Sequence, residues 1–286
     1  MSVGALLLII ISAFMHATWN YLAKRSNSGY AFVWLYMLVS TIVYAPLVVG
    51  MFIFSKIHIG WVEMGFILGS ALIHLAYSLT LQKGYRIGDF SLVYPIARGT
   101  GPVIVAIAAV FIFDEKITAT GITGIFLIVS SIFMITGGLQ RLRKSNRIVP
   151  LIYGLVIGVI ISGYTLFDKG AVAVFLIPPL LLSYGSILWQ LVFLTPKAIR
   201  NWTKIKYDWL KYRKEAIGVG ILNPLAYILV LTAMTFSPVS HVAPVREISI
   251  LIGTFMGTKL LAEGFGLQRV IAAGVMLVGV ILVALT

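Results

Sequence analysis

The stretch "YPIARGTGP", from Tyr94 to Pro102, places two prolines and an arginine inside a segment that is otherwise apolar enough to cross a membrane. A charge at the centre of a bilayer costs from about 3 kcal/mol on insertion scales to about 10 kcal/mol or more in simulations, so arginines at such positions usually serve a function. Arg98 therefore marks a candidate functional site, provided that the rest of the chain is a membrane protein.

The composition of the chain meets this condition. Of its 286 residues, 60% are hydrophobic and only 11% are charged, with a mean hydropathy of +1.02. A soluble domain carries about a quarter charged residues, so the composition predicts an all-α integral membrane protein with several spans. The basic residues behind the net charge of +13 lie mostly between apolar segments, as cytoplasmic loop charges do, so they give no reason to expect a nucleic-acid partner. The absence of cysteine excludes disulfides, thiolate catalysis and metal sites with cysteine ligands.

Ten apolar segments can be separated by their flanking Gly, Pro, Asn and charged residues. A membrane-spanning helix needs about 20 apolar residues, and each segment comes close to that length. The predicted spans are residues 3–23, 31–54, 62–82, 90–113, 119–139, 149–168, 177–196, 216–235, 239–261 and 268–285.

The basic residues fall mostly on one side of these spans. Seventeen of the 22 Lys and Arg residues lie in one set of alternate loops, three lie in the other set (Lys56, Lys116 and Lys169), and Arg98 and Arg246 lie within spans. Because cytoplasmic loops are enriched in Lys and Arg, this split predicts a multi-pass protein of the cytoplasmic (inner) membrane with both termini on the outer side.

The longest predicted loop contains "KAIRNWTKIKYDWLKYRKE", starting at Lys197. Its apolar and aromatic residues Trp202, Ile205, Trp209 and Tyr212 recur at helical spacing, with basic residues between them. This pattern predicts a short helix that lies in the cytoplasmic interface of the membrane and anchors the loop there.

Two halves of the chain resemble each other. "LAYSLTLQ" from Leu75 matches "LAYILVLT" from Leu225, "YPIAR" ending at Arg98 matches "APVR" ending at Arg246, and "WNYLAK" matches "YTLFDK". Glu115 and Glu263 keep the register of the two arginines. We therefore expect two copies of a five-span unit, residues 1–140 and 149–286, joined by a basic cytoplasmic linker at 141–148.

An odd number of spans per copy means that the second copy enters the membrane from the opposite side. Such inverted repeats are typical of secondary transporters, whose substrate site lies near the midplane at the repeat interface and is lined by interrupted helices. Arg98 beside Pro95 and Arg246 beside Pro244 are the equivalent interruptions. The repeat thus predicts that the arginine singled out above lines a central cavity.

The arrangement of these motifs resembles a known family. The polar first span "HATWNYLAKR", the prolines of the fourth and ninth spans, and the segments "DEKITATGITG" and "AEGFGLQRVIAAG" look like the drug/metabolite transporter superfamily, EamA type. The resemblance covers nearly the whole chain. It implies a ten-helix carrier that moves small metabolites by alternating access, often driven by protons or by exchange.

The polar residues within the spans are the candidate substrate-binding residues. They could equally act as polar contacts between helices or, for the arginines, as ion pairs with a carboxylate. The candidates are Arg98, Arg246, Tyr77, Tyr227, Trp19, Asn20, His16, Tyr94 and Asn223.

Glu247 is the acidic residue that lies well inside a predicted span, whereas Asp89, Asp114, Glu115 and Asp168 are placed at span edges. Adjacent helical residues point about 100° apart, so one carboxylate is not expected to serve both Arg98 and Arg246 without a kink. Desolvation raises the pKa of a carboxyl group, whereas a neighbouring arginine lowers it. Glu247 is therefore the candidate proton-coupling residue, with a permanent ion pair as the alternative.

We expect a secondary active transporter for a small anionic or zwitterionic metabolite, acting as a monomer or homodimer, with no cofactor. A lipid headgroup flippase or scramblase would share this architecture. An intramembrane lipid-modifying enzyme is the weaker alternative, because it would need a metal held by several side chains or a nucleophile with a nearby base. The single central glutamate and the scattered histidines supply neither, so we expect no enzymatic activity.

Overall fold

The computed structural model describes residues 3–54, 59–113, 118–137, 148–236, 245–264 and 266–284. Within these ranges the chain forms ten helices and no strand, which confirms the all-α prediction. The linker at 141–147, together with His58, Asp114, Glu115, His241 and Pro244, lies outside the described residues. The helices are α1 (Val3–Ser26), α2 (Tyr30–Phe54), α3 (Trp61–Ile87), α4 (Phe90–Phe113), α5 (Ala119–Thr136), α7 (Ile148–Ala173), α8 (Pro179–Arg200), α9 (Trp202–Phe236), α11 (Ile248–Leu260) and α12 (Gly266–Ala284).

Eight of these helices are long and apolar enough to cross a membrane by length and composition. The other two are α4, which carries Arg98 and two prolines, and the shorter apolar helix α11. Each predicted span contains the greater part of one helix or overlaps it, but the edges differ. Several helices extend past the predicted edges, with charged residues in their last turns, whereas α11 begins at Ile248, well inside the predicted span 239–261. The predicted fold, ten helices in a multi-pass membrane protein, is confirmed.

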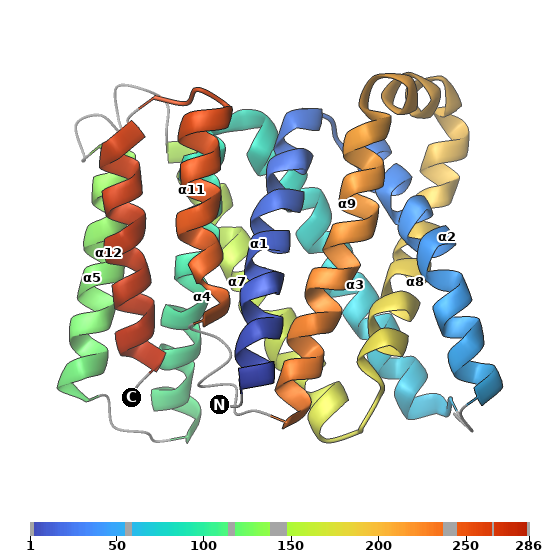
Figure 1. Cartoon of the computed structure of the whole chain (residues 1–286), viewed down its shortest axis with the longest axis horizontal. Helices are drawn as coiled ribbons and strands as arrows, with labels where there is room; N and C mark the ends of the chain where they lie inside the picture. The colour runs from blue at the N-terminus through green and yellow to red at the C-terminus, as the bar shows by residue number, and fades with distance from the viewer. Residues whose placement is uncertain are drawn as a thin grey trace.

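The helices form one bundle in which α1 begins and α12 ends at the same side (Figure 1). Helices of the first copy pack against their counterparts in the second, as α5 does with α12, α2 with α8 and α4 with α11. Contacts between helices that are not counterparts also follow the repeat: α1 contacts α9, and their counterparts α7 and α3 contact each other. This two-fold pattern of contacts is the one expected of inverted repeats.

Two glycines allow a very close backbone approach between the copies. A Cβ atom added to Gly124 of α5 would lie 2.7 Å from the carbonyl oxygen of Gly279 of α12, and one added to Gly279 would lie 2.8 Å from the carbonyl oxygen of Gly124. Small residues of this kind allow membrane helices to pack closely, so this contact depends on the absence of both side chains.

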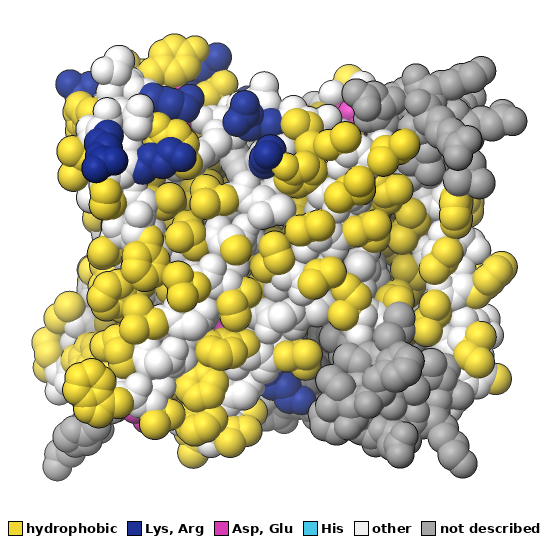
Figure 2. Space-filling model, turned by 180° about the vertical axis from the view of Figure 1, so that it is seen from behind, with side chains coloured by type: hydrophobic (Ala, Val, Ile, Leu, Met, Phe, Trp, Pro, Cys, Tyr) yellow, Lys and Arg dark blue, Asp and Glu magenta, His cyan; other side chains and the backbone are white. Residues whose placement is uncertain are grey.

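The surface of the bundle is divided into an apolar middle and a basic end. Figure 2 shows hydrophobic side chains over the middle of the molecule and Lys and Arg side chains gathered at one corner of the upper end. The exposed basic residues of the α8 to α9 region belong to this end: Lys197, Arg200, Lys204, Lys206, Lys211, Arg213 and Lys214. The separation is what a membrane-spanning protein needs, because the hydrocarbon core excludes charge.

The predicted interfacial helix is the first part of α9. The backbone departs from helical angles at Tyr212, and Figure 1 shows the part before this kink turned across the upper end of the bundle. Ile205 on this segment is buried against the bundle, whereas Trp202 and Trp209 remain partly exposed. The segment therefore has one face on the protein and aromatic residues available to the membrane interface.

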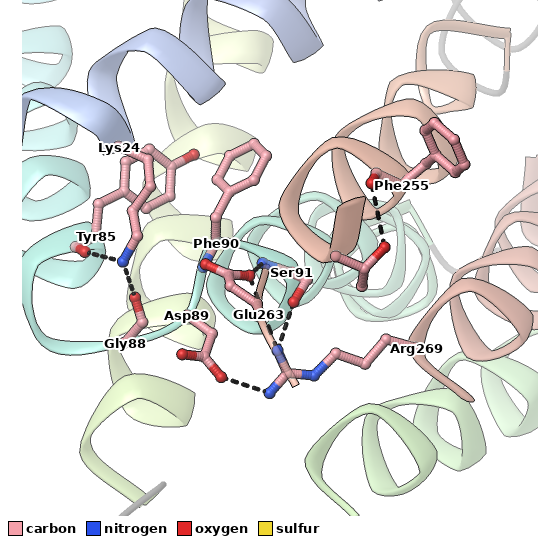
Figure 3. A network of polar contacts seen from close by, with 10 residues as sticks. Lys24, Tyr85, Gly88, Asp89, Phe90, Ser91, Phe255, Glu263 and Arg269 are labelled. Carbon is pink, nitrogen blue, oxygen red and sulfur yellow. Dashed lines mark hydrogen bonds and ion pairs between the residues drawn. The ribbon is translucent and has the colours of Figure 1, made fainter. Parts of the chain in front are cut away.

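At the end opposite the termini, a polar network ties the two copies together around the turn between α3 and α4 (Figure 3). The carboxylate of Glu263, which follows α11, accepts hydrogen bonds from the backbone N–H groups of Phe90 and Ser91, at 2.6 and 2.7 Å. These N–H groups belong to the first turn of α4 and have no partner within that helix. Glu263 therefore caps α4 from the other copy, with its negative charge at the positive end of the helix dipole.

Two cations complete this network. Lys24 of α1 donates to the carbonyl oxygens of Tyr85 and Gly88, both at 2.7 Å, at the negative end of α3. Arg269 of α12 pairs with Asp89 at 2.7 Å and donates to Ser91. The charge count assigned Arg269 to a loop, although it lies at the edge of the predicted span 268–285. In the structure it is fully buried in the first turn of α12, where it contacts residues of the other copy.

Candidate substrate-binding site

A narrow cavity lies in the middle of the bundle, between α1, α2, α3, α4, α7, α8 and α9. It has about 40 Å³ of space for the centres of water molecules. One water needs about 10–15 Å³ on this measure, so the cavity holds only a few waters in this conformation. Both copies supply its walls, as expected for a site at a repeat interface.

Six of the nine predicted binding residues line this cavity: Arg98, Tyr77, Tyr227, Trp19, His16 and Asn223. Two pairs of lining residues follow the repeat. Tyr77 and Tyr227 occupy equivalent positions, and Trp19 is equivalent to Tyr164, which also lines the cavity. The aromatic walls are therefore built from matching positions of the two copies.

The other three predicted residues do not appear among the lining residues. Asn20 is used for packing, since it donates to the carbonyl oxygen of His16 at 2.7 Å and accepts from the hydroxyl of Tyr85 at 2.6 Å. Tyr94 is buried, with its ring 5.9 Å from the guanidinium carbon of Arg98. Arg246 is buried as well and acts through its ion pair, described next.

Arg98, Arg246 and Glu247 form one buried cluster. The Nε atom of Arg98 lies 3.5 Å from Glu247 Oε2, and the Nε atom of Arg246 lies 3.2 Å from Glu247 Oε1. The sequence predicts such a double contact only where the helix has a kink, and that condition is met. Glu247 lies in a turn just before α11 begins at Ile248, and this break in the helix provides the kink that the double contact requires.

The cluster carries an excess positive charge. It combines two guanidinium groups with one carboxylate, and none of the three side chains is more than 7% exposed. Arg98 also donates to the hydroxyl of Ser249 at 3.3 Å, which is a neutral partner. Of these groups, Arg98 is the one that reaches the cavity. Whether Glu247 couples protons stays a prediction, and its position between two cations supports the alternative of a permanent ion pair.

His16 presents a hydrogen-bond donor to the same cavity. The indole N–H of Trp19 donates to His16 Nδ1 at 3.1 Å, so this nitrogen must be the unprotonated one in a neutral imidazole. The proton then lies on Nε2, which is buried and has no partner among the described residues. His16 and Arg98 thus both contribute N–H donors to the lining of the cavity.

The sequence pattern missed Asp168. It was placed at the edge of a span because Lys169 follows it, but α7 continues to Ala173 and Asp168 is fully buried. Its Oδ2 atom lies 2.9 Å from His74 Nε2 and accepts a hydrogen bond from the Tyr227 hydroxyl at 2.5 Å. Tyr164 lies one helical turn before Asp168, and this polar face of α7 was the signal in the sequence that could have revealed it.

No group of three or more His, Asp or Glu side chains that could hold a metal ion occurs in the described part of the chain. The groups that the cavity offers to a solute are cationic and neutral N–H donors, tyrosine hydroxyls, aromatic faces and one histidine backed by a carboxylate.

Inverted five-helix copies around a central polar cavity define the class of multi-pass membrane transporters. The comparisons with known proteins agree with this class. The chain belongs to the EamA-like transporter family, whose model matches residues 3–137 and again residues 148–285. It is thus a membrane transporter of the drug/metabolite type, from a family of transporters rather than enzymes.

A solved structure, titled only "Crystal structure of protein", is similar over 98% of both chains with a TM-score of 0.63 and 13% sequence identity. At this identity the likeness shows the fold alone. The comparison with curated proteins finds no match.

Proposed function

We propose that the protein is a secondary active transporter that moves a small anionic metabolite across the cytoplasmic membrane by alternating access. The observation that carries this proposal is the buried cluster of two arginines and one glutamate, from which Arg98 reaches the central cavity. An anion in the cavity would balance the excess positive charge of the cluster.

The charge balance favours an anion over a neutral or cationic solute. A buried charge without a partner is strongly unfavourable in a medium of low dielectric constant. A carboxylate or a phosphate matches the planar fork of a guanidinium group and can accept two hydrogen bonds from it. The Nε2–H group of His16 supplies a further donor from the facing helix α1.

The small size of the cavity supports alternating access. A cavity that holds only a few waters must enlarge before a solute larger than that can enter. The network around Glu263 and Arg269 joins the two copies at the end opposite the termini. Rocking of one copy against the other would break such contacts at one end and form equivalent contacts at the other.

A binding assay on the purified full-length protein tests this proposal. Thermal unfolding would be followed by the fluorescence of the six tryptophans in the presence of sodium salts of acetate, lactate, sulfate, phosphate and methyl phosphate. Glycine, choline and glucose represent zwitterionic, cationic and neutral solutes. A ligand that binds the folded state at a hundredfold excess over its Kd stabilises it by about 2.7 kcal/mol, so a binding anion should raise the unfolding temperature.

Substitution of the arginine gives the discriminating result. Arg98→Lys should weaken anion binding at least tenfold, because a lysine does not reproduce a two-point contact. Arg86→Lys, at an exposed arginine of α3, is the matched control and should bind normally. Stabilisation by choline or glucose but by no anion, or unchanged anion affinity in Arg98→Lys, would refute the proposal.

Transport then separates a solute carrier from a lipid flippase. In proteoliposomes, a carrier should accumulate the radiolabelled form of the anion that gave the largest thermal shift. It should leave fluorescent phospholipids in their original leaflet. Movement of the phospholipid without uptake of the anion would support the flippase instead.

A further inference from the structure

A second polar cluster at the cavity lies on the side of α3, α7 and α9. We propose that His74, held in place by Asp168, is a proton-binding site, and that this proton is bound together with the transported anion. The coupling to an anion rests on the proposed function, whereas the proton site itself is inferred from the geometry of His74 and Asp168.

The contacts of His74 are those of a histidine oriented by a carboxylate. Its Nε2 atom lies 2.9 Å from Asp168 Oδ2, and the same oxygen accepts a hydrogen bond from Tyr227 at 2.5 Å. With Nε2–H pointing at the carboxylate, the lone pair of Nδ1 has no hydrogen-bond donor among the described residues, and this is where a proton can be added. The ring of Tyr164 stacks on the imidazole at 4.2 Å and fixes its plane.

Asp168 gives the reason for a proton to bind there. Its side chain is fully buried, and its Oδ1 atom has no hydrogen-bond partner in the described ranges. Its ion-pair partner in the described structure is His74. A buried carboxylate with only neutral neighbours is an unmatched charge, and protonation of His74 converts the pair into a neutral one.

The groups that face His74 from the surrounding helices are mostly neutral. Tyr77 comes from its own helix α3, Tyr164 from α7 and Tyr227 from α9, with ring centroids 6.4, 4.2 and 5.2 Å from the imidazole. Gln190 of α8 lines the same cavity. Imidazole ordinarily changes its charge between pH 5 and 8, and these neighbours leave Asp168 as the nearest charged group.

Three further ionisable groups line the cavity: Arg98 of α4, in its cluster with Arg246 and Glu247, the neutral His16 of α1, and Tyr36 of α2. The excess positive charge of the arginine cluster opposes a second cation in the cavity. An anion bound at Arg98 removes this opposition, so anion binding favours the proton on His74. By reciprocity the proton must favour the anion to the same extent.

The balance of charge fits a coupled carrier. In the step we propose, one proton passes from water to His74 Nδ1, forming an N–H bond, and one anion enters beside Arg98. For a monovalent anion, the positive charge of the proton cancels the negative charge of the anion, so the loaded cavity has the same net charge as the empty one. A pH gradient could therefore drive anion accumulation without moving net charge across the membrane.

The proton site can be tested without knowing the anion. The chain has four histidines, so the full-length protein labelled with 13C at the histidine ring should give four imidazole signals in detergent. His74→Gln assigns the signal of His74. We expect this signal in the wild-type protein to move between pH 8 and pH 5 and to report the gain of one proton. A signal of His74 that stays unchanged over this range would overturn the proposal.

A second readout does not depend on whether His74→Gln folds. Asp168→Asn removes the charge but keeps an oxygen that can accept from His74 and Tyr227. At pH 6 this variant should bind fewer protons than the wild type in a potentiometric titration. Glu63→Gln, which removes a carboxylate from the first turn of the same helix α3 as His74, should leave the histidine signal unchanged. Equal proton binding by the wild type and Asp168→Asn in the potentiometric titration would contradict the role of Asp168.

The coupling is tested with inorganic phosphate and with lactate, whose single charge does not change over the range. Lactate should bind about tenfold more tightly at pH 5.5 than at pH 8 in the wild type, and this difference should vanish in Asp168→Asn. Lactate or phosphate binding that requires Arg98 but is independent of pH would overturn the coupling and leave the proposed function intact. If neither anion nor any other in the panel binds, the proposed function fails, and the histidine signal alone decides the proton site.

Discussion

Glu263→Gln tests how strongly the two copies are joined at the end of the bundle opposite the termini. The carboxylate accepts two backbone hydrogen bonds from the start of α4, at 2.6 and 2.7 Å, and its Oε2 atom lies 3.9 Å from Arg269. Hydrogen bonds to a charged group contribute about 1.5–3 kcal/mol each, whereas neutral ones contribute about 0.5–1.5 kcal/mol. Glutamine can keep one neutral bond but turns an N–H₂ group toward the second donor or toward Arg269.

We therefore expect the variant to lose about 2–4 kcal/mol of the free energy of unfolding. For a chain of this size, about 2–4 °C is lost per kcal/mol, so the unfolding temperature should fall by about 5–15 °C. The assay is thermal unfolding of the purified protein in detergent, followed by tryptophan fluorescence and by the loss of the monodisperse peak in size-exclusion chromatography.

Glu63→Gln is the matched control for this experiment. Glu63 accepts a hydrogen bond from the backbone N–H of Gly60 at 2.8 Å at the start of α3, but it does so in an exposed position and within one copy. Its replacement should cost about 0.5–1 kcal/mol, in the range of ordinary helix caps. If both variants lost the same small amount, the reasoning that Glu263 joins the two copies would be refuted.

Three further predictions follow from the described contacts. Gly124→Ala should lower the unfolding temperature because its Cβ atom would meet the backbone of Gly279, whereas Gly163→Ala, where a Cβ atom meets nothing within 4 Å, should not. Since the chain has no cysteine, single introduced cysteines report its topology. In intact cells, a membrane-impermeant maleimide should label Val174→Cys, and it should label Lys211→Cys only after permeabilisation. The reverse pattern would show that the termini face the cytoplasm. Trp19→Phe removes the indole N–H that fixes the tautomer of His16, so anion affinity should fall severalfold in a thermal-shift titration, while Trp61→Phe at a 93% exposed position should bind normally.

Hydropathy and internal similarity determined the architecture of this protein. Each predicted span corresponds to a helix, because backbone groups in a membrane must be paired within the segment and long apolar runs can achieve this only as helices. The repeat matches Tyr77 with Tyr227 and Trp19 with Tyr164, and all four line the same cavity. Substrate sites of inverted-repeat transporters lie at the interface of the two copies.

Several predicted span edges differ from the helix ends for a physical reason. Lys24, Arg86, Lys169 and Arg269 suggested loops, yet all four lie within helices. Long basic side chains can reach the interface or a partner while their backbone stays helical. The misplaced edge at Lys169 is what concealed the buried carboxylate of Asp168.

The partners of the charged residues were decided by the tertiary structure. Glu247 meets both Arg98 and Arg246 because the chain turns just before α11, and Glu263 caps α4 across a separation of more than 170 residues. His74 meets Asp168 from a different copy in the same way. Local patterns in the sequence indicate which residues can enter a membrane. The pairing of charged residues depends instead on how the helices of the two copies pack, and this packing follows from contacts over the whole chain.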